Sequence, residues 1–151
     1  MIWKPHVTVA AVIERNGKFL MVEELADGQV IYNQPAGHLE EGESLAAAVI
    51  REVQEETAWE FIPEAITGIY HWCKPGAGET FVRFCFTGTL AAHAPTQPLD
   101  AGIIAAPWLS HDELLALPAA RLRSPMVRKC LADYLSGQRY SMDIIHAIDI
   151  P

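Results

Sequence analysis

Three carboxylates, Glu52, Glu55 and Glu56, stand at relative positions 0, 3 and 4 of a short segment. At 3.6 residues per turn, this spacing places all three side chains on one face of a helix. Glu52 and Glu56 repel each other at i,i+4, which weakens an isolated helix by roughly 0.2–0.5 kcal/mol, so the cluster suggests a bound cation. Because no Cys or His stands beside them in the sequence, these hard oxygen ligands favour Mg²⁺ or Mn²⁺ over Zn²⁺.

The carboxylates need a helix to position them, and the flanking residues predict one. Ser44 is a suitable N-cap, and residues 34–43 contain the Pro and Gly of a shaped loop. Ala48 lies one turn before Glu52, and we expect its small side chain to leave room for a ligand beside the metal. The predicted core stripe on the opposite face consists of Ala46, Val49, Ile50 and Val53.

A bare E-x-x-E-E pattern is usually a solvated helix face, but here the spacing extends further. Gly37 is followed after five residues by Glu43, and after seven more by Arg51-Glu52-Val53, one residue and Glu55-Glu56. This arrangement resembles the Nudix box, G-x5-E-x7-R-E-U-x-E-E-x-G-U, in which U is a bulky apolar residue.

One position departs from the box, because Ala58 stands where the family has glycine and Trp59 is a less usual apolar residue after it. The glycine would end the helix in a left-handed conformation. Alanine there costs about 1 kcal/mol or shifts the turn. The departure affects the exit from the helix and not the carboxylates.

The resemblance implies a metal site with Glu52 and Glu56 as principal ligands. Glu55 would share the metal or orient a bound water, and the backbone carbonyl of Ala36 would add a further ligand. The expected cofactor is Mg²⁺, with Mn²⁺ as the alternative.

Two further charges of the box have supporting roles. Arg51 stands four residues before Glu55, within reach of a carboxylate, so we interpret it as a clamp on the acidic cluster; an ordinary surface ion pair is the alternative. Glu43 precedes the helix N-terminus, where an anion is favoured, and is expected to hold the loop; contact with the metal is the alternative.

The general base is open between three carboxylates. Glu55 is one candidate, and Asp100 and Glu79 are candidates outside the box. For Asp100 and Glu79, a solvated loop carboxylate is the alternative interpretation.

Other residues are candidates for substrate binding. Arg83 interrupts the apolar segment 81–86, so it needs a partner, either a substrate phosphate or base or an internal carboxylate. Trp72 could stack on a nucleobase or pyrimidine ring, or pack in the core. Gln34 precedes the metal loop and is expected to face substrate. Arg123 and Ser124 begin the last helix, where they could hold phosphate or merely cap it.

Composition narrows the class of protein. The chain has 151 residues, half of them hydrophobic, and a formal net charge of −8; its pI is about 5.1 and its mean hydropathy +0.12. We expect one globular domain over residues 1–151, monomeric or homodimeric, that binds neither nucleic acid nor membrane. Three cysteines without a CxxC spacing, no signal peptide and no long apolar run suggest the cytoplasm.

The sequence predicts an α+β domain. Helices are expected from Ser110 with a capping box to Glu113, and from Pro125 to about Leu135, and the short apolar tail from residue 140 is expected to be tied to the domain. The resemblance implies a mixed sheet sandwiched between helices. Strands are expected at 7–13, at 18–23 as its hairpin partner across Asn16-Gly17, and at 30–32, 65–72, 80–90 and 105–109.

Short motifs outside the box resemble one bacterial subgroup of the family. They are residues 4–10, 33–40, 95–98, 122–125 and 136–140. Members of this subgroup are phosphatases acting on nucleoside di- and triphosphates and on hydroxymethylpyrimidine diphosphate, a thiamin precursor. The resemblance therefore implies metal-dependent hydrolysis that releases terminal phosphate from a small substrate. The alternative is a catalytically silent nucleotide-binding or regulatory module, although such modules commonly lose box carboxylates.

Overall fold

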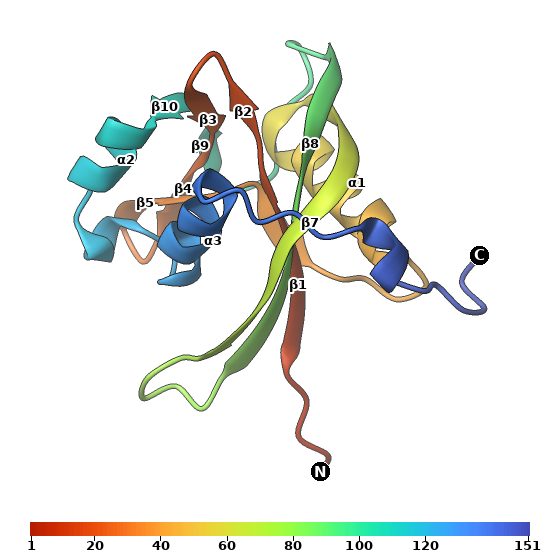
Figure 1. Cartoon of the computed structure of the whole chain (residues 1–151). Coiled ribbons are helices and arrows are strands. Elements are labelled where there is room, and N and C mark those ends of the chain that lie inside the picture. Colours follow the sequence, from red (N-terminus) through yellow and green to blue (C-terminus); the bar gives the residue numbers. More distant parts are fainter.

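The computed structural model describes residues 1–151 and combines ten strands with three short helices (Figure 1). The strands are β1 His6–Val12, β2 Glu14–Arg15, β3 Lys18–Leu20, β4 Val22–Ala26, β5 Gln29–Asn33, β6 Ala36–His38, β7 Trp59–Cys73, β8 Thr80–His93, β9 Ile103–Ala105 and β10 Trp108–Ser110. The helices are α1 Leu45–Thr57, α2 His111–Ala116 and α3 Met126–Leu135, with 3₁₀ turns at Ala119–Arg121 and Met142–Ile144. No helix has the length and apolar character needed to cross a membrane.

The main sheet is mixed, as expected. Its strand order is β6-β1-β8-β7, in which β1 and β8 run parallel and the other neighbours run antiparallel. Two smaller three-stranded sheets, β10-β3-β2 and β5-β4-β9, extend the fold beside it. The long antiparallel pair β7–β8 crosses the molecule and connects its two sides (Figure 1).

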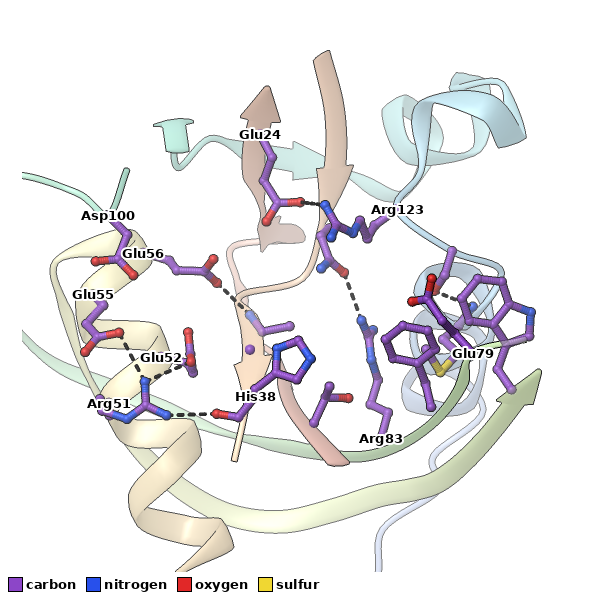
Figure 2. A pocket seen from close by; sticks show the side chains of 18 of the residues that line it. Glu24, His38, Arg51, Glu52, Glu55, Glu56, Glu79, Arg83, Asp100 and Arg123 are labelled. Atoms are coloured by element: carbon purple, nitrogen blue, oxygen red, sulfur yellow. Dashed lines mark hydrogen bonds and ion pairs between the residues drawn. The ribbon is translucent and has the colours of Figure 1, made fainter. Parts of the chain in front are cut away.

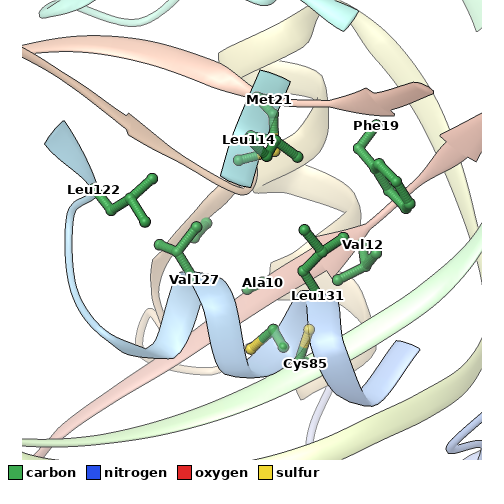
Figure 3. Packing of buried hydrophobic residues seen from close by; sticks show 11 residues of the cluster. Ala10, Val12, Phe19, Met21, Cys85, Leu114, Leu122, Val127 and Leu131 are labelled. Atoms are coloured by element: carbon green, nitrogen blue, oxygen red, sulfur yellow. The ribbon is translucent and has the colours of Figure 1, made fainter. Parts of the chain in front are cut away.

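The central strand β1 is buried on both faces, which explains its continuous apolar sequence. Val9 and Ala11 belong to one hydrophobic cluster, which is closed by residues of α1. Ala10 and Val12 face the other way, into a cluster that α2 and α3 cover (Figure 3). Helices therefore pack on both faces of the sheet, which confirms the predicted α+β sandwich.

Helix α1 begins and ends at the predicted residues. The Ser44 side chain accepts a hydrogen bond from the Ala47 N–H at 3.1 Å, which confirms the N-cap. Ala58 adopts the left-handed conformation at φ 61°, and its N–H bonds to the Gln54 carbonyl. The helix thus ends as a glycine would end it, at a steric cost of about 1 kcal/mol.

The buried face of α1 is rotated from the predicted stripe. Ile50 is 38% exposed and Ala48 is fully buried in the core, so the prediction was wrong for both residues. The acidic side of the helix is covered by β6 and its loop, so the buried stripe extends through Ala48 toward Glu52. Ala48 therefore packs in the core and leaves no room for a ligand.

The Asn16-Gly17 turn forms, with both residues at positive φ, but it joins different strands from those predicted. Strand β3 pairs with the two-residue strand β2, because β1 is already flanked by β6 and β8. The strand predicted at 105–109 is two strands, β9 and β10, which pair with β4 and β3. Pro107 separates them, since proline offers no N–H to a ladder.

The remaining elements deviate little. Strand β7 begins six residues earlier than predicted and accommodates Pro63 because it is an edge strand. The Ser110–Glu113 capping box is confirmed. Helix α3 begins at Met126, one residue after Pro125. Tyr140 exchanges two backbone hydrogen bonds with Ile66, at 2.9 and 2.8 Å, so the chain is tied to β7 where the tail begins.

Candidate active site and metal centre

A cavity of about 490 Å³ opens beside the sheet, between α1 and the ends of several strands (Figure 2). It collects most of the residues that the sequence singled out. The predicted residues in its wall are Ala36, Arg51, Glu52, Glu55, Glu56, Trp72, Glu79, Arg83, Asp100, Arg123 and Ser124. Gln34 and Glu43 are not in the wall.

Helix α1 presents its three carboxylates to this cavity, and a loop brings a fourth. Single oxygens of Glu52, Glu55 and Asp100 all lie within 4.8 Å of one another. The Asp100 N–H donates to the Glu55 carbonyl oxygen at 3.0 Å. The Gln97 and Gln54 amides bond to each other at 2.6 Å and anchor the same loop to the helix. Asp100 is thus fixed beside the helix, although it stands 44 positions after Glu56 in the sequence.

Burial disfavours the charged forms of Glu52 and Glu56 and raises their pKa values. Glu52 and Glu56 are only 8% and 6% exposed. Burial raises the pKa of Glu56 to about 9, against the effect of the Ala36 N–H, which donates to Glu56 Oε1 at 2.7 Å. The charges of Glu24, Glu52 and Asp100 raise the same pKa further. A bound cation would offset both the cost of burying the charged carboxylates and the repulsion between them.

Glu24 belongs to the same acidic group, and the sequence analysis missed it. It projects from β4 into the cavity, and its buried Oε2 makes no hydrogen bond. The only ion pair it makes is with Arg123, whose Nη1 lies 3.7 Å from that oxygen. The Glu23-Glu24 pair in a short strand gave no sequence signal that distinguishes one carboxylate from the other.

Arg51 holds several carboxylates of the site together. Its Nη1 donates to Glu52 at 2.8 Å and to Glu55 at 3.1 Å. Its Nε and Nη2 donate to the two oxygens of Glu43, at 3.0 and 2.7 Å, and Nη2 also reaches the His38 carbonyl. Glu43 in turn accepts a hydrogen bond from the Glu40 N–H, so it ties the loop to Arg51. Its side chain does not line the cavity. The network orients Glu52 and Glu55 before any ligand arrives.

Gly37 allows the loop to pass close to the helix. A Cβ built at this position would overlap the carboxylate of Glu52. Only glycine therefore permits β6 and Glu52 to approach as they do, which is a physical reason for a glycine at this position.

The acidic group fits a divalent metal ion. All the side-chain donors are hard carboxylate oxygens, which suit Mg²⁺ or Mn²⁺. One buried oxygen of Glu24 makes no hydrogen bond, and Gly37 leaves space for Glu52 where a side chain would block it. The residues that would hold the ion are Glu52, Glu55, Glu56 and Asp100, and Glu24 and Ala36 line the same cavity.

The two candidate bases outside the box lie in different places. Asp100 lies with Glu52 and Glu55. Glu79 lies on the opposite side of the cavity (Figure 2), where it pairs with Lys74 at 3.8 Å and His6 at 3.9 Å. A water held by the carboxylates of α1 is therefore out of reach of Glu79, and the prediction of Glu79 as a base does not fit the geometry.

Arg83 and Gln34 meet below the cavity. Arg83 Nη1 donates to the Gln34 side-chain oxygen at 3.0 Å, and Nη2 donates to Asn33 at 3.1 Å. The Gln34 amide nitrogen donates to the Val127 carbonyl at 2.8 Å. Gln34 is therefore buried and occupied at both ends of its amide, so the prediction that it faces substrate was wrong. It positions Arg83.

Trp72 lies in the cavity wall, stacked against Phe81 with ring centroids 5.5 Å apart. Arg123 is more than half exposed. Ser124 is buried, and its Oγ accepts from the Met126 N–H at 3.2 Å, so its hydroxyl caps the start of α3.

Other residues of the wall were not predicted from the sequence. They are Thr8, Asn33, His38, Glu40, Lys74, Phe81 and Met126. Thr8 and Phe81 stand on strands that were predicted, so only the strand register could have placed them. His38 contacts His6 at 3.3 Å between ring nitrogens, and burial lowers the pKa of His38.

Comparison with known proteins identifies close relatives. A family model described as NUDIX domain matches residues 4–130. Phosphatase NudJ of Escherichia coli (strain K12) is 43% identical over 150 residues, which cover 99% of this chain and 96% of the relative. A solved NUDIX hydrolase from Nitrosomonas europaea is 50% identical with a TM-score of 0.93, covering 97% of this chain and 99% of that one.

A more distant structure shares the fold alone. The NUDIX domain of Shewanella oneidensis NrtR, complexed with ADP ribose, has a TM-score of 0.74 at 20% identity, and 90% of each chain is covered.

Proposed function

This chain belongs to the NUDIX family and is a phosphoanhydride hydrolase, and we propose that it releases terminal phosphate from small phosphorylated substrates. We propose nucleoside di- and triphosphates and hydroxymethylpyrimidine diphosphate as these substrates, and Mg²⁺ in preference to Mn²⁺. The observation that carries the proposal is the acidic group, in which oxygens of Glu52, Glu55 and Asp100 lie within 4.8 Å of one another.

The proposed reaction is attack of water on phosphorus. The water oxygen bonds to phosphorus, the bridging P–O bond breaks, and a carboxylate accepts the proton of the water. A divalent cation held at this site would lower the pKa of water and neutralise phosphate oxygens. Phosphoryl transfer depends chiefly on positioning and electrostatics, which a rigid carboxylate group supplies.

The residues of the chain divide the remaining tasks. Arg51 fixes Glu52 and Glu55 in one orientation. Glu55 is the most exposed of the α1 carboxylates, so we assign it the role of general base, with Asp100 as the second candidate. Glu52 and Glu56, which are more deeply buried, are assigned to the cation.

The relatives support the type of product. NudJ is named a phosphatase, which is consistent with release of orthophosphate. The substrate assignment rests on the likeness to that relative over nearly the whole of both chains, together with the cavity volume of about 490 Å³, which suits a ligand of nucleotide size.

The test is phosphate release by purified protein on a panel of nucleoside di- and triphosphates and hydroxymethylpyrimidine diphosphate. We expect orthophosphate with Mg²⁺, none after chelation of the metal, and none from Glu56→Gln. Nucleotide binding without turnover by wild-type protein would instead identify a silent binding module. Pyrophosphate as the only product would overturn the assignment of terminal phosphate release.

A further inference from the structure

The main sheet presents a row of polar and aromatic side chains to the cavity. Residues alternate in direction along a strand, so Phe81 and Arg83 of β8 share one face. Thr8 of β1 is the register partner of Arg83, and Trp72 of β7 is the partner of Phe81. All four line the cavity. The next residue along this face of β8, Cys85, lies in the hydrophobic core, so Arg83 stands where the cavity ends and the core begins.

Arg83 carries a charge in this position without a direct ion pair, although this charge partly offsets the rise that burial causes in the pKa of Glu24 in the same cavity. Its residue is only 3% exposed, and its two hydrogen bonds go to the neutral amides of Asn33 and Gln34. No ion pair joins it to a carboxylate, and its buried Nε–H makes no hydrogen bond to an oxygen or nitrogen; the Cys130 thiol, whose pKa Arg83 lowers, is its neighbour on the core side. Burial of an unpaired charge is strongly unfavourable in a protein interior. By contrast, Arg51 bonds to three carboxylates.

A second polar group beside Arg83 also lacks a partner. Thr8 is 8% exposed, and its Oγ1 is buried without a hydrogen bond. Because nearly all buried polar groups are bonded, two unpartnered donors on neighbouring strands indicate an acceptor that arrives from outside. The charge of Arg83 indicates that this acceptor is an anion.

We propose that Arg83 and Thr8 form an anion subsite that binds the phosphate group nearest the ring of the substrate, while Trp72 and Phe81 stack against the ring. That the next phosphate of the substrate is cleaved off depends on the proposed function, but binding of a phosphate at this subsite does not. The ligand class is a planar heteroaromatic ring that carries phosphate.

The order of groups across the cavity follows from this assignment. Figure 2 shows Arg83 between Glu52 on one side of the cavity and Glu79 on the other. The aromatic residues Trp72 and Phe81 line the side of Glu79, since Glu79 directly precedes the start of β8. A ring held there and a phosphate held by Arg83 direct the next phosphate toward the carboxylates. For a diphosphate substrate, the retained product is then a monophosphate bound at Arg83.

The test is calorimetric titration of metal-free protein, in the presence of chelator, with a nucleoside monophosphate and separately with inorganic phosphate. We expect Arg83→Met to weaken monophosphate binding at least about tenfold, since a charged hydrogen bond is lost. Thr8→Val should weaken it about three- to tenfold and leave the fold intact, because its hydroxyl has no partner to lose.

Two comparisons sharpen the result. Arg139→Met removes the same charge from an exposed residue outside the cavity. This variant should bind the nucleoside monophosphate with the affinity of wild type. Trp72→Ala should weaken binding of the monophosphate while binding of inorganic phosphate stays unchanged.

The proposal is overturned if Arg83→Met, folded by circular dichroism, binds the monophosphate as tightly as wild type. Should Arg83→Met fail to fold, wild-type affinity in Thr8→Val has the same meaning. Glu56→Gln should keep monophosphate affinity within about threefold of wild type even where hydrolysis is absent. The assay of phosphate release therefore tests the proposed hydrolysis, and the monophosphate titration tests the subsite separately.

Discussion

The two sides of the cavity are built differently. The carboxylate side comes mostly from one segment, residues 36–56, in which a loop leads directly into α1. The side around Arg83 is assembled from β1, β5, β7 and β8, which only the register of the sheet brings together. Local sequence spacing therefore determines the positions of the residues on the carboxylate side, whereas tertiary structure determines those on the side around Arg83.

The charges on the two sides are also arranged differently. The carboxylates repel one another, and Arg51 compensates only part of their charge from the rim. Arg83 is a single buried cation that no carboxylate pairs with. Each side therefore lacks the partner that a metal-bound phosphorylated substrate would bring, a cation for the carboxylates and an anion for Arg83.

The largest expected effect is on the carboxylate side. Glu52→Gln should lower kcat by about a thousandfold or more, because a lost metal ligand removes several kcal/mol of stabilisation and each 1.4 kcal/mol is tenfold. Glu60→Gln is the matched control, since Glu60 is exposed and lies outside the cavity. Steady-state phosphate release checks both. Equal rates in the two variants would show that the carboxylate side is not catalytic.

Gly37→Ala tests the close approach of loop and helix. The added methyl group would overlap the Glu52 carboxylate, so we expect kcat to fall about a hundredfold as that side chain is displaced. In Gly42→Ala the added methyl meets open space, although φ is +80°, so stability should fall by about 1 kcal/mol with little change in kcat. Full activity in Gly37→Ala would contradict the positioning argument.

The difference between the two sides explains what could be predicted from sequence. The helix over residues 45–57, its N-cap and the spacing of its carboxylates follow from local rules, and the left-handed Ala58 is one of the two outcomes expected there, the other being a shifted turn. Glu24 and Thr8 could not be found, because short strands place alternate residues by register and register depends on partners distant in sequence. The prediction that Gln34 faces substrate was wrong for a related reason, because its burial depends on a contact with α3, which is distant in sequence.

The aromatic end should give a smaller effect. Trp72→Ala should raise KM about three- to tenfold for a substrate with a ring, with kcat little changed, because stacking contributes to binding and not to the reacting bond. Trp72→Phe should recover most of the affinity. A kcat defect in Trp72→Ala with unchanged KM would assign this residue to the reacting end instead.

The smallest expected effect is on stability, and its sign follows from Glu56. Its pKa is raised to about 9 from the usual 4.5, so between these values the folded chain holds a proton that the unfolded chain has lost. The free energy of unfolding of metal-free protein should therefore fall as pH rises through this window. We expect the Tm of wild type to drop by about 5 °C more than that of Glu56→Gln between pH 6 and pH 8.5 in thermal scans. Parallel curves for the two proteins would contradict the assigned pKa.

The most direct test of the divided cavity is a Mn²⁺ titration followed by electron paramagnetic resonance. Wild type and Arg83→Met should bind Mn²⁺ with equal affinity, and Glu56→Gln should bind it at least about tenfold more weakly, since it loses an anionic ligand at the acidic side. Mn²⁺ affinity that is unchanged in Glu56→Gln would contradict the account.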